Sequence, residues 1–379
     1  MSTSISIKEL KELDPSSYQI VDIRDAVEIS HGAIPGALVM KTEEIETSDA
    51  IDRSKKTIIC CSRGRFSVAA AEELQEKGWD AVSLEGGYIA WLMDVMSAPE
   101  EQDKAADVEK SLRKKFKKSI WSKFTKAINT YELVKPGDKI AVCISGGKDS
   151  MLMAKCFQDL KRFSKFEFDV KFLVMDPGYS EANRKVIENN AKILHVPITI
   201  FESNIFDSVY HIEKSPCYLC ARMRRGHLYN FARELGCNKI ALGHHYDDVI
   251  ETILMGMLYG AQVQTMMPKL HSTNFEGMEL IRPLYLIREA DIIHWANYND
   301  LHFIQCACRF TEHCASCGGT EKGSKRAEIK ELIHELAQKD PVIEYNIFRS
   351  VENVNLNTVI GYKQDGVRHN FLDTYDDVK

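Results

Sequence analysis

Short apolar runs alternate with amphipathic stretches in the N-terminal part of the chain. Between residues 5 and 96, runs such as YQIVDI and KTIICC predict strands, and stretches such as SVAAAEELQEKG have the apolar spacing of a helix. Buried strands that alternate with helices favour a small α/β domain with a mainly parallel sheet. We therefore predict an α/β domain over residues 1–98.

The pattern changes after this domain. Residues 99–109 are acidic and poor in large apolar side chains, which predicts an inter-domain linker. In residues 110–130 an apolar residue recurs at every fourth position, and lysine or arginine fills much of the rest, which predicts a basic amphipathic helix. Three interpretations of such a helix are open. Its basic face is simply solvated, it binds RNA phosphates or, as the least favoured interpretation, it lies on an anionic membrane surface. The lysines expected at RNA are Lys114, Lys115, Lys117 and Lys118.

A second alternation of strands and helices begins after Pro136 and Gly137. The runs KIAVCIS, FDVKFLVMD, VPITIF and NKIALG predict strands separated by helices. This order is typical of a doubly wound parallel sheet, in which ligand sites lie at the carboxyl ends of the strands. We predict that this second α/β domain spans residues 131–360 and that the polar residues 361–379 form a loosely held tail.

Composition and charge narrow the class of protein. A length of 379 residues suits roughly two or three compact domains, and 44% hydrophobic with 27% charged residues is ordinary for a globular protein. The net charge of -6 argues against indiscriminate coating of nucleic acid, although a local basic patch can still meet a phosphate backbone. The first residues lack a signal-peptide pattern and no run of about 18 apolar residues occurs, so we expect a cytoplasmic protein without a membrane span.

The chain has 11 cysteines, several at CxxC or CxC spacing. In a large chain without a signal peptide this spacing indicates metal binding or reactive sulfur more than a disulfide framework. Cys143, Cys156 and Cys237 lie in apolar or helix-end contexts, and we expect them to be inert.

Cys61 stands between a predicted buried strand and a predicted helix. Amides of the following loop, the helix N-terminus and Arg63 or Arg65 would each stabilise a thiolate or persulfide there. Cys60 belongs to the strand and alternates to the opposite face, so we interpret it as core. The loop after Cys61 consists of Ser62, Arg63, Gly64, Arg65, Phe66 and Ser67.

Residues 5 to 96 resemble the rhodanese family through VDIRDAVEI, GAIPGA, CSRGRFS and EGGYIAW, in that order. The resemblance implies that Cys61 accepts sulfane sulfur, from a cysteine desulfurase or another donor, and passes it on. One departure is Ala33, where the family often has histidine; His31 stands two residues earlier. A phosphatase relative and an inactive module are the alternatives.

A glycine-rich loop, SGGKDS, lies between a predicted buried strand and a predicted helix. Its glycines allow close approach to phosphate, and the amides at the helix start would cradle the phosphate. Lys148 adds positive charge and Asp149 is expected to help hold magnesium. The predicted ATP-binding residues of this loop are Ser145, Gly146, Gly147, Lys148, Asp149 and Ser150.

A second motif, ALGHHYDDVIET, follows a later strand. Gly243 ends that strand, and we expect the carboxylates of Asp247, Asp248 and Glu251 to share a helix face and to position magnesium or the attacked group. Helix-capping acids are the alternative. Asp176, which ends the strand FLVMD, is the predicted adenosine contact, and Gly243 and Asp248 complete the predicted ATP site. The two motifs together resemble the PP-loop ATP pyrophosphatases, which cleave ATP between the α and β phosphates and adenylate a substrate oxygen.

Cys217 and Cys220 open a predicted helix next to Pro216. The helix N-terminus and Arg224 or Arg225 favour their thiolates, yet CxxC alone leaves zinc, a disulfide and an iron-sulfur cluster open. Cys306, in FIQCAC, is a third candidate ligand.

SGGKDS, CxxC, GHHYDDVIET and the later FIQC, taken as a set, resemble the tRNA 2-thiocytidine synthetases of the PP-loop class. The resemblance implies a [4Fe-4S] cluster held by Cys217, Cys220 and Cys306, with one iron open to sulfur. Beyond the expected ligands the chain has further cysteines and a histidine. Three roles are open for them: a small zinc site, relay of sulfur, or replacement of Cys306 as a cluster ligand. These residues are Cys308, His313, Cys314 and Cys317.

The function that this resemblance implies is ATP-dependent 2-thiocytidine formation in the anticodon loop of tRNA. ATP with Mg²⁺ would adenylate the base, Arg224 and Asp247 would lie closest to it, and Cys61 would supply sulfur in cis. Thiolation of another tRNA base or of a small metabolite is the alternative with the same chemistry. An iron-sulfur sensor that binds ATP without turnover is the alternative of a different class. The oligomeric state is open, with a homodimer as one candidate.

Overall fold

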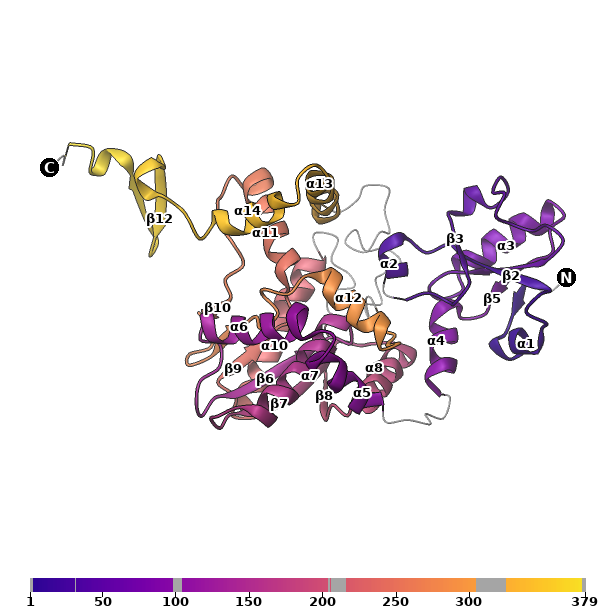
Figure 1. Ribbon diagram of the computed structural model, residues 1–379, viewed down its shortest axis with the longest axis horizontal. Coiled ribbons are helices and arrows are strands. Elements are labelled where there is room, and N and C mark those ends of the chain that lie inside the picture. Colours follow the sequence, from indigo (N-terminus) through magenta and orange to yellow (C-terminus); the bar gives the residue numbers. More distant parts are fainter. Residues whose placement is uncertain are drawn as a thin grey trace. The chain divides into compact units, whose positions relative to one another are not determined.

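The computed structural model of the protein describes residues 3–30, 32–97, 104–203, 205, 216–304 and 325–376 (Figure 1). The chain divides into two compact units. The first consists of Met1–Tyr246 with Pro268–Gly319, and the second of Asp247–Met267 with Thr320–Lys379. Both of the larger sheets belong to the first unit. Among the described residues, no helix combines the length and the apolar composition that crossing a bilayer requires.

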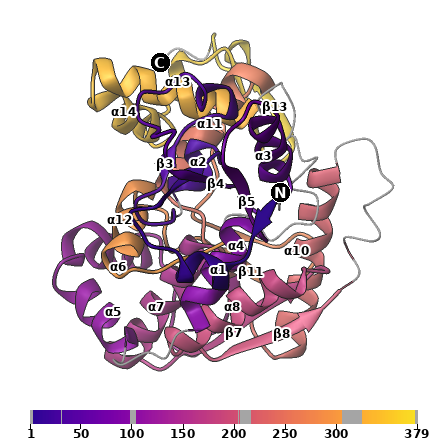
Figure 2. The ribbon, with the colours of Figure 1, turned by 90° about the vertical axis from the view of Figure 1, so that its right-hand side faces the viewer.

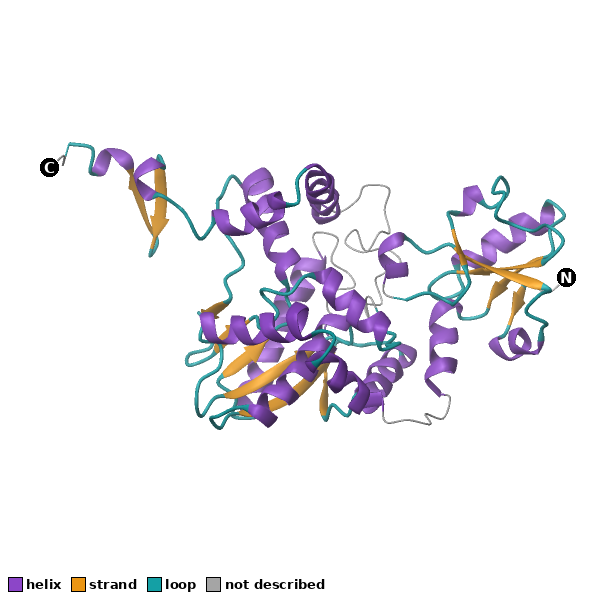
Figure 3. Cartoon of the chain, viewed as in Figure 1, coloured by secondary structure: helices purple, strands orange, loops and turns teal. Residues whose placement is uncertain are grey.

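The N-terminal sheet has five strands, which are all parallel, and it confirms the predicted α/β class (Figure 3). In spatial order the strands are β1 (Ser4–Ile5), β5 (Ala81–Leu84), β4 (Lys56–Cys60), β2 (Tyr18–Asp22) and β3 (Leu38–Val39). The helices of this domain are α1 (Ile7–Glu12), α2 (Ala26–Ser30), α3 (Phe66–Glu76) and α4 (Gly87–Ser97).

Strand β4 is buried on both faces, as expected for the middle of a parallel sheet. Ile58 belongs to a buried cluster that includes Leu92 of α4, whereas Ile59 belongs to one that includes Ala71 of α3. The same alternation places Cys60 in the cluster of Ile58. The chain then leaves the strand at Cys61, so the loop begins at the carboxyl end of β4.

The segment predicted as linker and basic helix is helical from residue 104, in three parts. These are α5 (Lys104–Arg113), a π-helical turn η2 (Lys117–Trp121) and α6 (Ser122–Thr130). Residues 104–109, expected to be linker, therefore belong to α5, where Ala105 and Val108 are buried. The prediction of one continuous helix over 110–130 is also wrong, because α5 ends at Arg113 and a π-helical turn precedes α6.

The four-residue apolar spacing explains the break in this helix. In a regular α-helix a repeat of four residues drifts by about 40° each time, so the apolar stripe would turn away from the core. Wider hydrogen bonds compensate: Phe116 N donates to Ser111 O at 2.9 Å and Trp121 N donates to Phe116 O at 3.2 Å. All members of the stripe are buried, namely Leu112, Phe116, Ile120, Phe124 and Ile128.

The second sheet has six strands, five of them parallel, and it confirms the doubly wound fold. In spatial order they are β10 (Lys269–His271), β11 (Glu279–Ile281), β9 (Lys239–Ala241), β6 (Lys139–Ile144), β7 (Asp169–Asp176) and β8 (Ile198–Glu202), of which β7 and β8 are prominent in Figure 2. Its helices are α7 (Lys148–Phe163), α8 (Glu181–Ile193), α10 (Pro216–Glu234) and α12 (Glu289–Tyr298). Helix α11 (Tyr246–Gly260) starts at the last residue before the second unit and belongs to that unit from Asp247 onward.

Alternating side chains of β6 serve both layers of helices. Val142 shares a buried cluster with Leu152 of α7, while Ala141 shares a different one with Ala232 of α10. Strand β6 lies between β9 and β7, and all three run in the same direction. Their carboxyl ends, which carry the candidate motifs, therefore meet at one edge of the sheet.

The second unit contains α13 (Lys325–Lys339), α14 (Val342–Ser350) and a two-stranded hairpin of β12 (Gly361–Gln364) and β13 (Val367–Asn370). Residues 361–370, predicted as part of a loose tail, thus form a hairpin. Asp365 and Gly366 connect its strands with φ angles of 50° and 81°. An Asp-Gly pair with two positive φ angles is a favoured two-residue turn, and the polarity of the segment obscured this signal.

Candidate active site

The Cys61 thiol lies inside the loop that follows β4. Cys61 is 4% exposed, and its Sγ accepts a hydrogen bond from Gly64 N at 3.2 Å. Ser67 Oγ lies 3.3 Å from the same sulfur and 2.8 Å from Ser83 Oγ. The loop therefore presents an amide and a hydroxyl to Cys61, as a site for a thiolate or persulfide requires.

A glycine at the start of α4 completes this loop. Gly87 has a φ of 61°, and a Cβ at this position would lie 2.2 Å from Cys61 O and 2.6 Å from Gly64 N. Tyr88 N donates to Cys61 O at 2.8 Å. A side chain at Gly87 would therefore displace the loop. Gly87 belongs to the EGGYIAW motif, but nothing in the sequence indicated that it contacts the cysteine loop.

The other loop residues surround the thiol at different depths. Ser62 Oγ donates to Glu28, Arg63 is half-buried, and Arg65 and Phe66 are exposed. Cys60, in contrast, lies in the core, where burial first and nearby Asp22 second raise the pKa of its thiol far above the usual range. Of the two adjacent cysteines, Cys60 is thus held as a neutral thiol.

The three cysteines expected to be inert, Cys143, Cys156 and Cys237, are buried. Burial raises the pKa of the Cys143 thiol to about 12 and also raises the pKa of Cys156 and of Cys237. None of them is therefore suited to form a thiolate near neutral pH.

The SGGKDS loop connects β6 to α7. Ser145 N donates to Ser150 Oγ at 3.2 Å, and Ser150 Oγ donates to Gly147 O at 2.9 Å. Gly147 has an extended conformation at the position before the first helical residue. These hydrogen bonds fold the loop back on the helix N-terminus, which is where backbone amides bind phosphate.

The charged residues of this loop are partly buried. Lys148 is 5% exposed, with its Nζ 3.1 Å from Glu289 Oε1 and 3.3 Å from Asp149 Oδ1. Asp149 Oδ1 is shielded from solvent, and beside the ion pair with Lys148 it accepts no hydrogen bond from the part of the chain that the structure describes. A shielded carboxylate oxygen with spare acceptor capacity suits a phosphate-bound cation. Sequence reasoning missed Glu289, which lies outside both nucleotide motifs.

Gly243 brings the second motif to the first. It follows β9, and a Cβ at this position would lie 3.3 Å from Ser150 N and 3.4 Å from Asp149 C. These distances are tighter than most Cβ contacts, so a side chain at Gly243 would push the two backbones apart by a few tenths of an ångström. The predicted ATP-site residues Gly243, Asp149 and Ser150 are therefore brought together.

The acidic residues of the second motif lie in the first turns of α11 and belong to the second unit from Asp247 onward. Arg326 of α13 contacts two of them, with Nη2 2.6 Å from Asp248 Oδ1 and Nε 2.6 Å from Glu251 Oε2. Burial raises the pKa of Glu251, and Arg326 opposes this shift. Nothing in the sequence indicated Arg326, because 75 residues separate it from Glu251.

Asp176 lies at the end of β7, as predicted, and its carboxylate stabilises the following turn. Oδ1 accepts hydrogen bonds from Gly178 N at 2.8 Å and Tyr179 N at 2.6 Å, and Arg184 Nη1 lies 3.4 Å from Oδ2. Its contact with adenosine stays a prediction. Arg224 of α10 reaches the same turn, with Nη2 3.5 Å from the Tyr179 hydroxyl.

The predicted cluster ligands are described in part. Cys217 and Cys220 lie at the start of α10, but only their backbone is among the described residues. Cys306 lies outside the described residues, together with Cys308, His313, Cys314 and Cys317. The ligand set therefore stays a prediction.

The four lysines predicted at RNA are exposed, namely Lys114, Lys115, Lys117 and Lys118. Lys115 Nζ also lies 3.6 Å from the centre of the Tyr298 ring. Arg113 points elsewhere and contacts the fully buried Asp159 through Nε and Nη2, both at 2.9 Å. The segment thus separates into an anchoring face and a face of exposed lysines.

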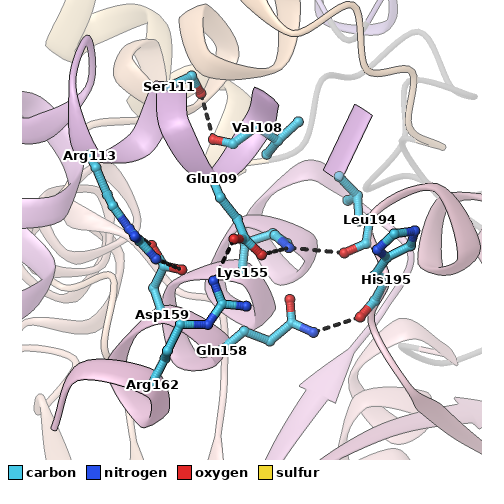
Figure 4. A network of polar contacts seen from close by, with 10 residues as sticks. All are labelled: Val108, Glu109, Ser111, Arg113, Lys155, Gln158, Asp159, Arg162, Leu194 and His195. Carbon is cyan, nitrogen blue, oxygen red and sulfur yellow. Dashed lines mark hydrogen bonds and ion pairs between the residues drawn. The ribbon is translucent and has the colours of Figure 1, made fainter. Parts of the chain in front are cut away.

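A network of ion pairs anchors α5 to α7 (Figure 4). Lys155 is fully buried, and its Nζ lies 3.0 Å from Glu109 Oε1 and donates to Leu194 O at 3.0 Å. Arg162 Nη1 lies 2.7 Å from the other oxygen of Glu109. Glu109, expected in an acidic linker, therefore neutralises a charge in the core.

Two family models match the chain. A rhodanese-like domain matches residues 6–94, and a PP-loop domain matches residues 114–308. A tRNA-cytidine(32) 2-sulfurtransferase from Coxiella burnetii is 34% identical over 244 residues, which cover 64% of this chain and 91% of that protein. The protein of the same name from Alcanivorax borkumensis is 35% identical over 258 residues, covering 66% of this chain and 86% of the relative.

Solved structures resemble both parts of the chain. The U34-tRNA thiolase NcsA from Methanococcus maripaludis with its [4Fe-4S] cluster is 21% identical, with a TM-score of 0.48 over 61% of this chain and 76% of that chain. A rhodanese-like domain protein from Staphylococcus aureus is 35% identical, with a TM-score of 0.22 over 24% of this chain and 91% of that chain. Because both TM-scores are low, the fold assignment rests on the two strand orders and the two family models.

Proposed function

Because this chain belongs to the tRNA-cytidine(32) 2-sulfurtransferase family and also contains a rhodanese-like domain, we propose that it replaces the C2 oxygen of a tRNA cytidine by sulfur carried on Cys61. The enzyme class, an ATP-dependent sulfurtransferase, follows from the family. The names of the relatives give position 32 as that of the modified cytidine. We propose the same position for this chain.

The contact between Gly243 and the SGGKDS loop is the observation that carries the ATP-dependent step. An amide-like oxygen is a poor leaving group, whereas AMP leaves readily, so adenylation prepares the C2 position for sulfur. The loop amides and Lys148 would stabilise the charge that develops on pyrophosphate. The shielded Asp149 Oδ1 supports a role in holding Mg²⁺ beside the phosphates.

On the side of the base, we propose Arg224 and Asp247. Arg224 approaches the turn after β7, at the edge of the sheet where the nucleotide motifs meet. Its guanidinium would balance negative charge near the adenylated oxygen. Asp247 is the second residue of α11 and stands in its first turn. Its carboxylate would orient the base.

The cysteines at the start of α10 fit a [4Fe-4S] cluster. Cys217 and Cys220 are three positions apart, in the first helical turn, where free amides and the helix dipole favour thiolates. With Cys306 they would leave one iron with an open position, which supplies a site for sulfur when the cluster is bound. A set of these three thiolates would differ from a structural zinc site, which has four protein ligands.

The surroundings of Cys61 support its role as the sulfur carrier. Its thiolate would attack the outer sulfur of a persulfide, taking that sulfur and releasing the donor as a thiolate. The Gly64 amide and the Ser67 hydroxyl would then stabilise the charge on the terminal sulfur. A cysteine desulfurase or another sulfane sulfur donor would supply the persulfide.

The exposed lysines of the α5 to α6 segment support a role in binding tRNA. Lys114, Lys115, Lys117 and Lys118 are close in sequence and face solvent, while the opposite face of the segment is fixed in the core. Such a rigid basic face suits a phosphate backbone.

Nucleoside analysis of tRNA tests this function. Cells that lack the gene should lose 2-thiocytidine, and the full-length chain expressed from a plasmid should restore it. Unchanged thionucleosides in the deletion strain would refute the tRNA function, and loss of a different thionucleoside would reassign the base. Release of pyrophosphate that depends on tRNA separates an enzyme from a sensor that binds ATP without turnover.

A further inference from the structure

An acidic residue outside both nucleotide motifs contacts the SGGKDS lysine. Glu289 is the first residue of α12, and its Oε1 lies 3.1 Å from Lys148 Nζ. The side chains are 17% and 5% exposed, so the pair is largely shielded from water. Of the residues that the structure describes, Asp149 is the other carboxylate in contact with the ammonium, at 3.3 Å. Lys148 is thus held between a residue of its own loop and a residue 141 positions away.

The residues before Glu289 contact the start of the second motif's helix. Tyr246, the first residue of α11, donates its N–H to Ile287 O at 2.9 Å. The Arg288 guanidinium lies over the Tyr246 ring, 4.9 Å from its centre. Ile287 itself is fully buried, and its N–H donates to Leu284 O at 2.8 Å. The segment 287–289 therefore contacts both nucleotide motifs from a fixed position.

We propose that Glu289 is a positioning residue that holds the Lys148 ammonium in place at the SGGKDS loop. The inference rests on the proposed function, in which Lys148 meets the pyrophosphate.

The geometry explains why a second carboxylate is needed. A lysine side chain has four rotatable bonds, and its ammonium is not confined by a planar fork as a guanidinium is. Asp149 follows Lys148 in the sequence and moves with the same loop, so by itself it does not fix the ammonium relative to the rest of the site. Glu289 belongs to a different helix and provides an independent point of attachment. Fixing the ammonium before the reaction avoids the loss of rotational freedom during it.

Glu289→Gln tests this role with a small change in shape. The amide keeps the length of the side chain and one acceptor oxygen but loses the charge. For release of pyrophosphate that depends on tRNA, we expect kcat to fall about 10- to 100-fold, while the KM for ATP changes by less than about threefold. Glu289→Asp, which keeps the charge on a shorter side chain, should recover part of kcat.

Asp291→Asn is the matched control. Asp291 lies on the same helix and forms an ion pair of the same length, 3.1 Å, with Lys123 of α6. The substitution removes one negative charge close to Glu289 without touching Lys148, and we expect kcat to stay within about twofold of the wild type. A similar fall in kcat for Asp291→Asn would show that the charge of the helix start, and not the contact with Lys148, is responsible.

Chemical acetylation read by mass spectrometry measures the position of Lys148 without turnover. Glu289→Gln should increase modification of Lys148 several-fold, and Asp291→Asn should do the same for Lys123 only. Melting temperatures show that the variants are folded. Unchanged modification of Lys148, an unchanged kcat, or a fall in the KM for ATP with kcat retained would each overturn the inference. If the wild type releases no pyrophosphate with tRNA, the proposed function fails, and the acetylation result still decides whether Glu289 holds Lys148.

Discussion

Two adjacent cysteines show how a one-residue difference in position separates an inert thiol from the proposed sulfur carrier. Cys60 is the last residue of β4 and lies in the core, where burial raises its pKa. Cys61 is the first residue of the loop and has an amide donor and a hydroxyl beside its sulfur. The alternation of a strand and the start of a loop were both readable in the sequence. The contribution of Gly87 was not, because a contact between separate segments has no local sequence signal.

Cys61→Ser should reduce sulfur transfer from a sulfane donor to background, because the hydroxyl of serine cannot carry a persulfide. Transfer is measured as sulfide or thiocyanate formed with a small acceptor. Cys60→Ala is the matched control and should retain transfer, since Cys60 is a buried neutral thiol. Full transfer by Cys61→Ser would assign the carrier to another cysteine.

A single histidine, His302, makes the stability of the fold depend on pH. Burial lowers the pKa of its imidazole, and the carboxylate of Asp300, 3.0 Å from Nε2, opposes this shift. The folded protein therefore binds the proton less well than the unfolded chain does. The contribution of His302 to stability is therefore fully present above the unfolded pKa of about 6.5 and is lost as the pH falls from there toward the lowered pKa of the folded state.

His302→Gln should flatten this part of the pH profile. The measurement is the free energy of unfolding in urea between neutral and mildly acidic pH, compared with the wild type. An equal slope in the variant and the wild type would show that another group causes the acid sensitivity.

At the scale of elements, the segment from α5 to α6 combines a buried apolar face with an exposed basic face. Its four-residue apolar spacing predicted an amphipathic structure, and the structure accommodates that spacing with a π-helical turn. The start of α5 was predicted as linker because its residues are polar and small. Their helix is stabilised by partners far along the chain, such as Lys155 and Asp159, which a local pattern does not reveal.

Glu109→Gln should destabilise the fold, because it leaves the Lys155 ammonium buried without its carboxylate. We expect a loss of about 2 to 4 kcal/mol in the free energy of unfolding, below the upper end for a buried pair because Glu109 is 19% exposed. Glu181→Gln, which removes an exposed pair with Lys185, is the control and should change stability little. Equal stability of the two variants would mean that the network does not anchor α5.

Lys117 and Lys118 lie in the π-helical turn and are exposed. A double substitution by glutamine should weaken tRNA binding and reduce the dependence of log Kd on log salt by about 1 for each lysine. Lys185→Gln, a change of one exposed lysine on α8, should leave the slope unchanged. An unchanged slope in the double variant would place the RNA contact elsewhere.

For the whole molecule, the sequence predicted two α/β domains, and both sheets are present with the expected parallel strands. Motifs at strand ends, such as SGGKDS and Gly243, were also predictable, because the carboxyl ends of neighbouring parallel strands meet at one edge. Glu289 and Arg326 were not predicted, since each acts through a side chain that reaches a distant part of the chain. A separate unit is formed by the residues from Asp247 to Met267 and from Thr320 onward. The motif ALGHHYDDVIET therefore begins in the first unit and ends in the second.

The central claim is that sulfur from Cys61 enters a tRNA cytidine in a reaction driven by ATP. The most direct measurement follows a heavy sulfur isotope from a sulfane donor, through the full-length protein, into unmodified tRNA with ATP and Mg²⁺ present. We predict labelled 2-thiocytidine with the wild type and none with Cys61→Ser or without ATP. Labelled 2-thiocytidine from the Cys61→Ser variant at the wild-type level, or no labelled nucleoside from the wild type, would contradict the account.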